Sequence, residues 1–160
     1  MKHPLFFLLL LFLLLPKVCL AESATVTRIS DGDTIIVTRH DGKPVKVRIY
    51  GIDCPEQRQP WGQEATDFVT ALLPPGSVVL VEAVERDRYG RTVGMVILPD
   101  GSNLSETLVT QGFAWVYDKY CLLDECAQWR QLESVARLDK RGLWGNGNAV
   151  PPWEWRRGKR

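Results

Sequence analysis

Short runs of β-branched residues separated by turn signals constrain the fold of this chain more than any other feature. The run from Thr34 to Thr38 is β-branched throughout, which favours an extended strand. In the next run Val47 and Ile49 flank Arg48, so a strand there places the arginine side chain on the face opposite the two apolar residues. Asp-Gly pairs, which are typical of tight turns, occur at 31–32, 41–42 and 100–101. These patterns predict strands over 24–29, 34–38, 45–52, 77–84 and 92–98.

Helical patterns interrupt the strands once and dominate after the last strand. Apolar residues recur at helical spacing after position 64, and Pro74-Pro75-Gly76 ends that segment. Asn103 and Glu106 have the spacing of a capping box, and Asp124 is placed to cap a last helix. We therefore expect helices over 65–73, 103–109 and 124–141. A chain of 160 residues with this order favours one α+β domain, a five-stranded OB-like closed β-barrel with about three packed α-helices.

The first 21 residues have the pattern of an export signal. Lys2 precedes an uninterrupted run of Leu and Phe from Leu5 to Leu15, and small residues follow. At about 1.5 Å per residue this run spans only about half of the roughly 30 Å hydrocarbon core, which disfavours a transmembrane helix. We expect a signal peptide over 1–21 that is cleaved after Ala21. The alternatives are an uncleaved anchor and a lipid anchor at Cys19, although lipidation needs a residue smaller than Val18 before it.

Cleavage would leave a nearly neutral chain with three cysteines. Lys2 and Lys17 depart, so 18 basic and 19 acidic side chains remain, and the net charge of −1 excludes a global positive field that gathers polyanions. Cys121 and Cys126 are five residues apart, and we expect them to form a disulfide in an oxidising compartment. Cys54 is then unpaired and is interpreted as a small buried residue.

The remaining sequence divides into a domain over 22–145 and a C-terminal tail over 146–160. The tail is rich in Asn, Gly and Pro before its basic end, so we expect it to be irregular. Such a tail is either solvated or holds a polyanion loosely. Trp153 within it is interpreted as a packing residue rather than a base-stacking one.

Four stretches carry acidic, guanidinium or aromatic groups that a plain barrel does not need. They are Asp31–Thr34, Arg48–Glu56, Asp87–Arg91 and Trp115–Tyr120, and each alone has an ordinary structural explanation such as a turn. Guanidinium pairs donate bidentate hydrogen bonds to phosphate oxygens, carboxylates with a carbonyl hold a hard cation, and a further carboxylate aligns or deprotonates a water. The combination indicates phosphodiester hydrolysis, and the sequence contains no Walker loop, Rossmann fingerprint or paired zinc knuckle.

In this order and spacing the stretches resemble the staphylococcal (micrococcal, thermostable) nuclease family over roughly residues 23–145. The matching motifs are Asp-Gly-Asp-Thr at 31–34, Arg-x4-Asp-x-Pro-Glu at 48–56, Asp-x-Tyr-Gly-Arg at 87–91 and Gln-Gly-x-Ala at 111–114. The resemblance implies that the Asp33 and Asp53 carboxylates and the Cys54 carbonyl, where the family often has Thr, bind Ca²⁺. It also implies that Asp31 lies just outside this coordination sphere.

The resemblance further implies catalytic and phosphate-binding roles. Arg48 and Arg91 would clamp the scissile phosphate. Glu56 would either orient or deprotonate the attacking water, and both roles stay open. Arg88 and Tyr89 match positions near a terminal phosphate of bound nucleotide.

The tyrosine that packs beside a nucleotide base corresponds to Tyr117 or Tyr120, where this sequence departs from the family pattern. The implied function is that of a secreted or periplasmic, Ca²⁺-dependent nuclease that hydrolyses DNA and RNA at the 5′-oxygen and leaves 3′-phosphate products. We expect a monomer without stable membrane association after signal cleavage. The alternative is a non-catalytic OB-fold module that binds nucleic acid or a peptide.

Overall fold

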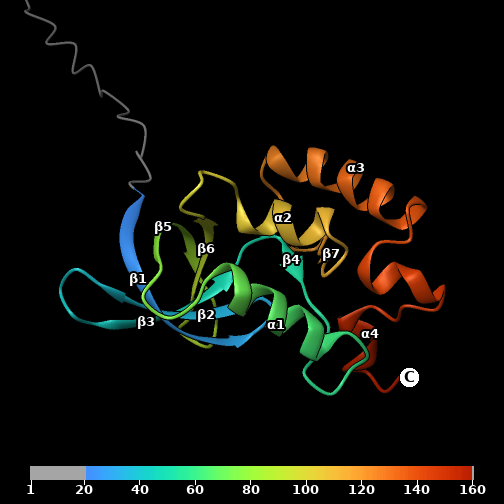
Figure 1. Cartoon of the computed structure of the whole chain (residues 1–160), viewed down its shortest axis with the longest axis horizontal. Helices are drawn as coiled ribbons and strands as arrows, with labels where there is room; N and C mark the ends of the chain where they lie inside the picture. The colour runs from blue at the N-terminus through green and yellow to red at the C-terminus, as the bar shows by residue number, and fades with distance from the viewer. Residues whose placement is uncertain (1–20, 160) are drawn as a thin grey trace, which may run out of the picture.

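Five strands close into a barrel in the computed structural model, which describes residues 21–159 (Figure 1). The strands are β1 (Glu22–Asp31), β2 (Thr34–Arg39), β3 (Pro44–Ile49), β5 (Val78–Arg86) and β6 (Thr92–Ile97). Around the barrel their order is β1-β2-β3-β6-β5, and only the β3–β6 pair is parallel. The predicted signal peptide over 1–21 lies, except for Ala21, outside the described residues.

Three main helices lie outside the barrel. They are α1 (Gly62–Leu72), α2 (Leu104–Thr110) and α3 (Glu125–Leu138). The first packs against β1, whereas α2 packs against both β6 and α3, so that α2 and α3 lie together (Figure 1). Asn103 caps α2 as expected, because its Oδ1 accepts a hydrogen bond from the Ser105 amide at 2.8 Å. The arrangement confirms the predicted α+β fold, a five-stranded barrel with about three helices.

The third strand is shorter than predicted, and this difference shapes the site. β3 ends at Ile49 because the chain turns at Gly51, which has a φ of 73°, and continues as the short strand β4 (Ile52–Asp53). β4 pairs outside the barrel with β7 (Trp115–Val116). The turn thereby places Asp53 next to the aromatic stretch around β7, where it pairs with Trp115.

The helix predicted over 124–141 is α3, which starts where predicted but ends earlier. Asp124 precedes α3 but its side chain makes no capping hydrogen bond. The helix ends at Leu138 rather than near Arg141, because Lys140 adopts a left-handed φ of 55° and the chain turns there.

The C-terminal tail is more regular than expected. The 3₁₀ helix η1 (Gly142–Asn146) ends at the first residue of the tail, and the short helix α4 (Pro152–Trp155) lies within the tail. Pro152 stands at the start of α4, where its fixed φ suits a helix and no backbone N–H is needed. The side chain of Gln59 donates to the Val150 carbonyl, and α4 lies near the beginning of α1 (Figure 1). The prediction of an irregular segment over 146–160 is therefore wrong for α4.

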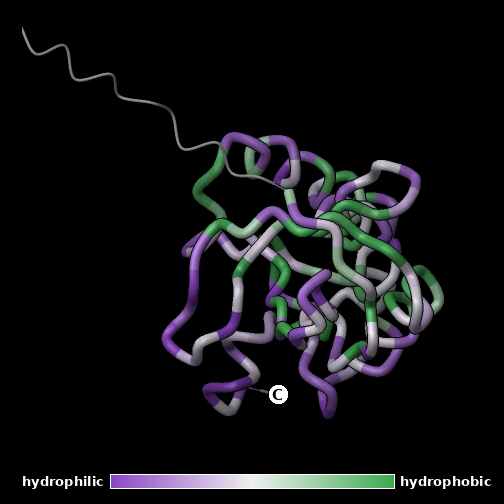
Figure 2. Tube along the Cα trace, turned by 90° about the vertical axis from the view of Figure 1, so that its left-hand side faces the viewer, coloured by the Kyte–Doolittle hydropathy of each residue, from purple (hydrophilic) through white to green (hydrophobic). Residues whose placement is uncertain are grey.

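Apolar side chains on alternate strand positions form the core of the barrel. Val47 and Ile49 are buried there, which confirms the predicted alternation around Arg48. A second apolar cluster consists of Trp115, Ala136, Leu143 and Trp144. Trp61, Ala149 and Trp153 pack against it. In Figure 2 the most hydrophilic stretches lie in the outer loops and at the C-terminal end.

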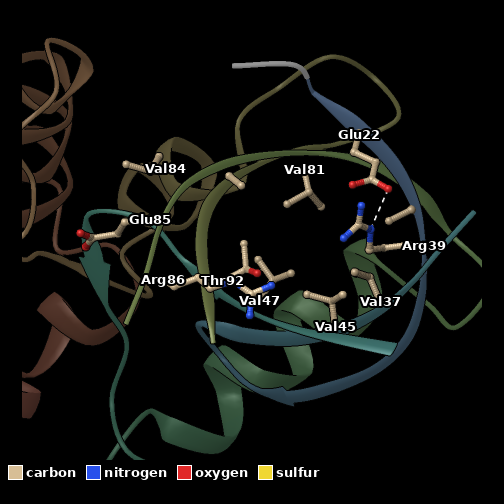
Figure 3. A pocket seen from close by; sticks show the side chains of 12 residues that line it. Glu22, Val37, Arg39, Val45, Val47, Val81, Val84, Glu85, Arg86 and Thr92 are labelled. Carbon is tan, nitrogen blue, oxygen red and sulfur yellow. Dashed lines mark hydrogen bonds and ion pairs between the residues drawn. The ribbon is translucent and has the colours of Figure 1, made fainter. Parts of the chain in front are cut away.

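A cavity of about 320 Å³ lies inside the ring of strands (Figure 3). Val37, Val45 and Val81 line it, and an ion pair between Arg39 Nε and Glu22 Oε1, 2.7 Å apart, stands at its edge. The predicted site residues line a different cavity.

Cys121 and Cys126 form the predicted disulfide, with Cα atoms 5.6 Å apart, and Cys54 is a free, buried cysteine as expected. No helix within residues 21–159 is long and apolar enough to cross a membrane.

We expect Gly51→Ala to destabilise the protein more than Gly42→Ala. Both glycines have left-handed φ values, 73° and 77°, so both substitutions carry a backbone cost of about 1–2 kcal/mol. A Cβ at Gly51 would lie 2.7 Å from Cys121 Sγ and 2.9 Å from a Trp129 ring carbon, whereas nothing lies within 4 Å of one at Gly42. Overpacking adds about 1–3 kcal/mol at Gly51. Equal losses in the free energy of unfolding in urea would contradict this packing.

Candidate active site

One cavity of about 970 Å³ contains every predicted catalytic, metal-binding and substrate-binding residue. Its lining includes Asp31, Asp33, Arg48, Asp53, Cys54, Glu56, Arg88, Tyr89, Arg91, Tyr117 and Tyr120. These residues come from the β1–β2 turn, β3, β4 with the loop after it, the β5–β6 turn and the segment after β7. The fold thus brings together four stretches that are far apart in the sequence.

Arg48 joins two buried carboxylates within this cavity. Its Nη1 lies 2.7 Å from Asp33 Oδ1, and its Nη2 donates to Asp53 Oδ1 at 2.8 Å. The side chain of Asp33 is 11% exposed and that of Asp53 only 2%. The guanidinium therefore takes the place of water as the partner of both carboxylates.

Burial and mutual repulsion both disfavour ionised carboxylates here. Burial and the charge of Asp33 raise the pKa of Asp53 to about 6, although the Arg156 hydrogen bond and the Arg48 charge act in the opposite direction. Asp31 accepts a hydrogen bond from the Asp33 amide at 3.2 Å, and burial together with the Asp33 charge raises its pKa to about 6 as well. Burial alone would lower the pKa of Arg48, but the neighbouring carboxylates outweigh burial and raise it. The cluster consequently favours additional positive charge.

The backbone at Cys54 fixes the orientation of Asp33. The Cys54 amide donates to Asp33 Oδ2 at 2.8 Å. Its side chain packs so closely on the β1–β2 turn that a Cβ at Gly32 would lie 2.9 Å from both Cys54 Cβ and Ala65 Cβ. Burial and the Asp33 charge raise the pKa of the thiol well above its ordinary value. The Cys54 side chain is thus a neutral packing group, and its polar contribution to the site comes from the backbone.

Glu56 lies at the solvent side of the cavity, next to Asp53. Its side chain is 42% exposed, and its amide donates to Gln59 Oε1 at 3.1 Å. Its carboxylate accepts a hydrogen bond from Arg156 Nη1, which also lies 3.4 Å from Asp53 Oδ1. Water can therefore reach this carboxylate, as a group that orients or deprotonates a water requires.

The β5–β6 turn holds the second predicted guanidinium. Arg91 Nε donates to Asp87 Oδ2 at 2.6 Å, and the Arg91 amide donates to Asp87 Oδ1 at 2.9 Å. The guanidiniums of Arg88 and Arg91 lie 4.8 and 5.5 Å from the ring centre of Tyr89. Asp87, to which the sequence pattern assigned no role, thus orients Arg91.

Both candidate tyrosines line the cavity. Tyr117 and Tyr120 form an edge-to-face pair with ring centres 4.9 Å apart. Tyr117 reaches this position because its amide donates to the Gly51 carbonyl at 2.8 Å, which continues the β4–β7 pairing. The Tyr117 ring also stacks on the Trp153 ring, with ring centres 4.9 Å apart and an interplanar angle of 11°. Both tyrosines stay candidates for packing against a base.

Three tail residues, Trp153, Arg156 and Arg157, line the cavity without having been predicted to do so. Trp153 packs, as expected of it, but it does so on Tyr117 at the edge of the cavity. Arg156 Nη2 donates to Asp53 Oδ2 at 2.7 Å. The available sequence signal is the order Pro-Pro-Trp-Glu-Trp-Arg-Arg at 151–157, in which prolines that begin a helix precede aromatic residues and two arginines.

The donor set suits a hard divalent cation that is bound weakly. Asp33 and Asp53 offer carboxylate oxygens whose mutual repulsion a cation would relieve, and Ca²⁺ prefers oxygen ligands. The Cys54 carbonyl belongs to the backbone that already contacts Asp33. Among the described residues 21–159, no group of three or more His, Cys, Asp or Glu side chains is arranged to hold a metal. Backbone, water and substrate oxygens would therefore have to complete the coordination.

Comparison with known proteins adds independent evidence. Residues 46–146 match the family described as "Staphylococcal nuclease homologue". An "Uncharacterized endonuclease" of Escherichia coli O157:H7 is 41% identical over 144 residues, which cover 90% of this chain and 91% of that protein. A "Micrococcal nuclease" of Shigella flexneri is 38% identical over 140 residues, covering 82% and 79%. A "Staphylococcal-like nuclease" of Arabidopsis thaliana is 35% identical over 143 residues, covering 88% of this chain and 43% of the plant protein.

We expect Asp31→Asn to stabilise the protein at neutral pH. Because the pKa of Asp31 rises from 3.8 to about 6 on folding, the folded state binds its proton more tightly, and stability is lost as pH rises between these values. Asn does not ionise and avoids this loss, which amounts to about 3 kcal/mol at about 1.4 kcal/mol per pKa unit. In urea unfolding with a chelator present, the difference between variant and wild type should grow from about pH 4 to about pH 6 and then stay constant. A difference independent of pH would contradict the raised pKa.

Proposed function

The chain belongs to the staphylococcal nuclease family, and from this premise we propose that it is an exported, Ca²⁺-dependent endonuclease that hydrolyses DNA and RNA. In this proposal the bond to the 5′-oxygen breaks and the products carry 3′-phosphates. The observation that carries the proposal is the single cavity that contains the Asp33–Arg48–Asp53 bridge together with Glu56 and Arg91. A non-catalytic binding module would not need this combination of buried carboxylates and oriented guanidiniums.

Arg48 and Arg91 are proposed to bind the scissile phosphate. A phosphodiester carries one negative charge and gains a second as the nucleophile attacks, so fixed guanidiniums stabilise the transition state more than the bound substrate. Each arginine is already oriented by carboxylates, Arg48 by Asp33 and Asp53 and Arg91 by Asp87, which reduces the cost of ordering during the reaction. A terminal phosphate of the bound nucleotide would lie near Arg88 and Tyr89, which belong to the same β5–β6 turn and line the same cavity.

Glu56 is proposed to orient or deprotonate the attacking water. Its partial exposure allows water to bind, and its position next to Asp53 keeps that water close to the phosphate bound by the arginines. When bound by Asp33, Asp53 and the Cys54 carbonyl, Ca²⁺ would supply positive charge that polarises the phosphoryl group. Two carboxylates make a weak site, so we expect activation at millimolar Ca²⁺, as in other extracellular sites.

The substrate and the compartment follow from charge and redox chemistry. With a net charge of −1 on residues 22–160, affinity has to come from the arginines of the cavity, which predicts strong salt sensitivity and a preference for flexible or single-stranded nucleic acid. The Cys121–Cys126 disulfide suits an oxidising compartment and supports secretion or a periplasmic location. We propose a monomer whose nuclease domain spans 22–145.

We expect Arg91→Ala to lower cleavage of a quenched-fluorophore single-stranded DNA by about 10²–10³-fold, because a donor to the transition state is lost. The matched control is Arg28→Ala, since Arg28 is exposed on β1 and does not line the cavity. Cleavage is measured with Ca²⁺, with Mg²⁺ and with excess chelator. Full activity in chelator would refute the cation requirement, and equal activity of both variants would refute the phosphate clamp.

Asp87→Asn tests the orientation of Arg91 separately from its charge. Asn keeps a hydrogen-bond acceptor for the turn amides but loses the ion pair with Arg91 Nε, so we expect a loss of about tenfold in kcat through misplacement of the guanidinium. The rate is measured against substrate concentration beside wild type. A change confined to KM would indicate that Asp87 affects only binding.

A further inference from the structure

The C-terminal tail enters the active site although it lies beyond residue 146, where the match to the family ends. Two contacts hold it in place. Gln59 donates to the Val150 carbonyl, and the Trp153 ring stacks on Tyr117 at 4.9 Å. Because Trp153 also packs against the second apolar cluster, α4 has a defined position next to the cavity. This segment is therefore part of the site and not a solvated extension.

Arg156, directly after α4, contacts the two carboxylates that matter most for the proposed chemistry. Its Nη2 donates to Asp53 Oδ2 at 2.7 Å, and its Nη1 donates to Glu56 Oε1. Arg48 contacts the other oxygen of Asp53, Oδ1, at 2.8 Å. Asp53 thus lies between two guanidiniums, and both of its oxygens already have a cationic partner.

A divalent ion and Arg156 need the same oxygens. Ca²⁺ binds carboxylate oxygens at about 2.3–2.6 Å, which leaves no room for a guanidinium hydrogen bond to the same lone pairs, and the two positive charges repel one another. Arg48 is 14% exposed and is enclosed between Asp33 and Asp53, whereas the Arg156 side chain is 43% exposed. Arg156 is consequently the partner that can turn toward solvent.

We propose that Arg156 is a tethered competitor of the divalent cation, which neutralises Asp53 and Glu56 in the cation-free enzyme and leaves Asp53 when the ion binds. The inference rests on the proposed Ca²⁺-dependent function. It assigns to Arg156 a positioning role that sets the cation concentration at which the enzyme works. The apparent affinity for the ion is reduced by the fraction of molecules in which Arg156 occupies the site.

The test compares Arg156→Gln with wild type in the absence of substrate. Ca²⁺ affinity is measured by displacement of luminescent Tb³⁺, and the Ca²⁺ concentration for half-maximal DNA cleavage is measured in parallel. If Arg156 occupies the site in about nine molecules of ten, Arg156→Gln should bind Ca²⁺ about tenfold more tightly. Arg156→Lys, which keeps the charge but loses the bidentate geometry, should lie between the two. Arg28→Gln has the same charge change at an exposed residue that does not line the cavity, and it should leave both values unchanged.

The outcomes separate this inference from the function on which it rests. Tighter Ca²⁺ binding by Arg156→Gln, with half-maximal cleavage at lower Ca²⁺, supports the competitor. If wild type needs Ca²⁺ but Arg156→Gln binds Ca²⁺ equally or more weakly, the competitor role of Arg156 is overturned. The nuclease proposal then stays intact. A merely structural ion pair would lower the free energy of unfolding of Arg156→Gln without changing its Ca²⁺ affinity. Cleavage by wild type in excess chelator would overturn the cation requirement and the competitor together.

Discussion

The bridge from Asp33 through Arg48 to Asp53 is the interaction on which the rest of the site depends. Two carboxylates that are almost excluded from water repel each other, and an unpaired buried charge costs far more than a paired one. A planar guanidinium satisfies both carboxylates through separate N–H groups, which the point charge of a lysine would not do. Because Arg48 belongs to β3 and the carboxylates to the β1–β2 turn and β4, the same contacts that organise the site also hold these elements together.

The cavity balances its negative charge with partners that differ in burial. Arg48 is enclosed between Asp33 and Asp53, and Arg91 is held at the β5–β6 turn by Asp87. Arg156 is half-exposed and comes from the C-terminal tail. Arg48 carries one positive charge and contacts two buried carboxylates, so it compensates their charge only in part. The remaining negative charge favours weak binding of a cation. Because residues 22–160 have no net positive charge, we propose that the arginines of the cavity supply the positive charge that binds phosphate.

Much of the site was predictable because its residues occur in compact motifs. Arg48 and Asp53 are five residues apart in one motif, and strand alternation was enough to place the Arg48 side chain on the face opposite Val47 and Ile49. The break at Gly51 was not predicted, since apolar residues continue through Ile52 and a positive φ leaves no periodic signal. Arg156 contacts Asp53 across 103 residues, and no spacing rule links the two. Only the packing of the tail on Tyr117 and on the second apolar cluster reveals this contact.

The most direct test of this account is a crystal structure of the protein with Ca²⁺ and a short single-stranded DNA analogue that resists cleavage. We expect one ion bound by the Asp33 and Asp53 carboxylates and the Cys54 carbonyl, with the scissile phosphate between Arg48 and Arg91. An ion bound elsewhere, or a phosphate that contacts neither arginine, would contradict it.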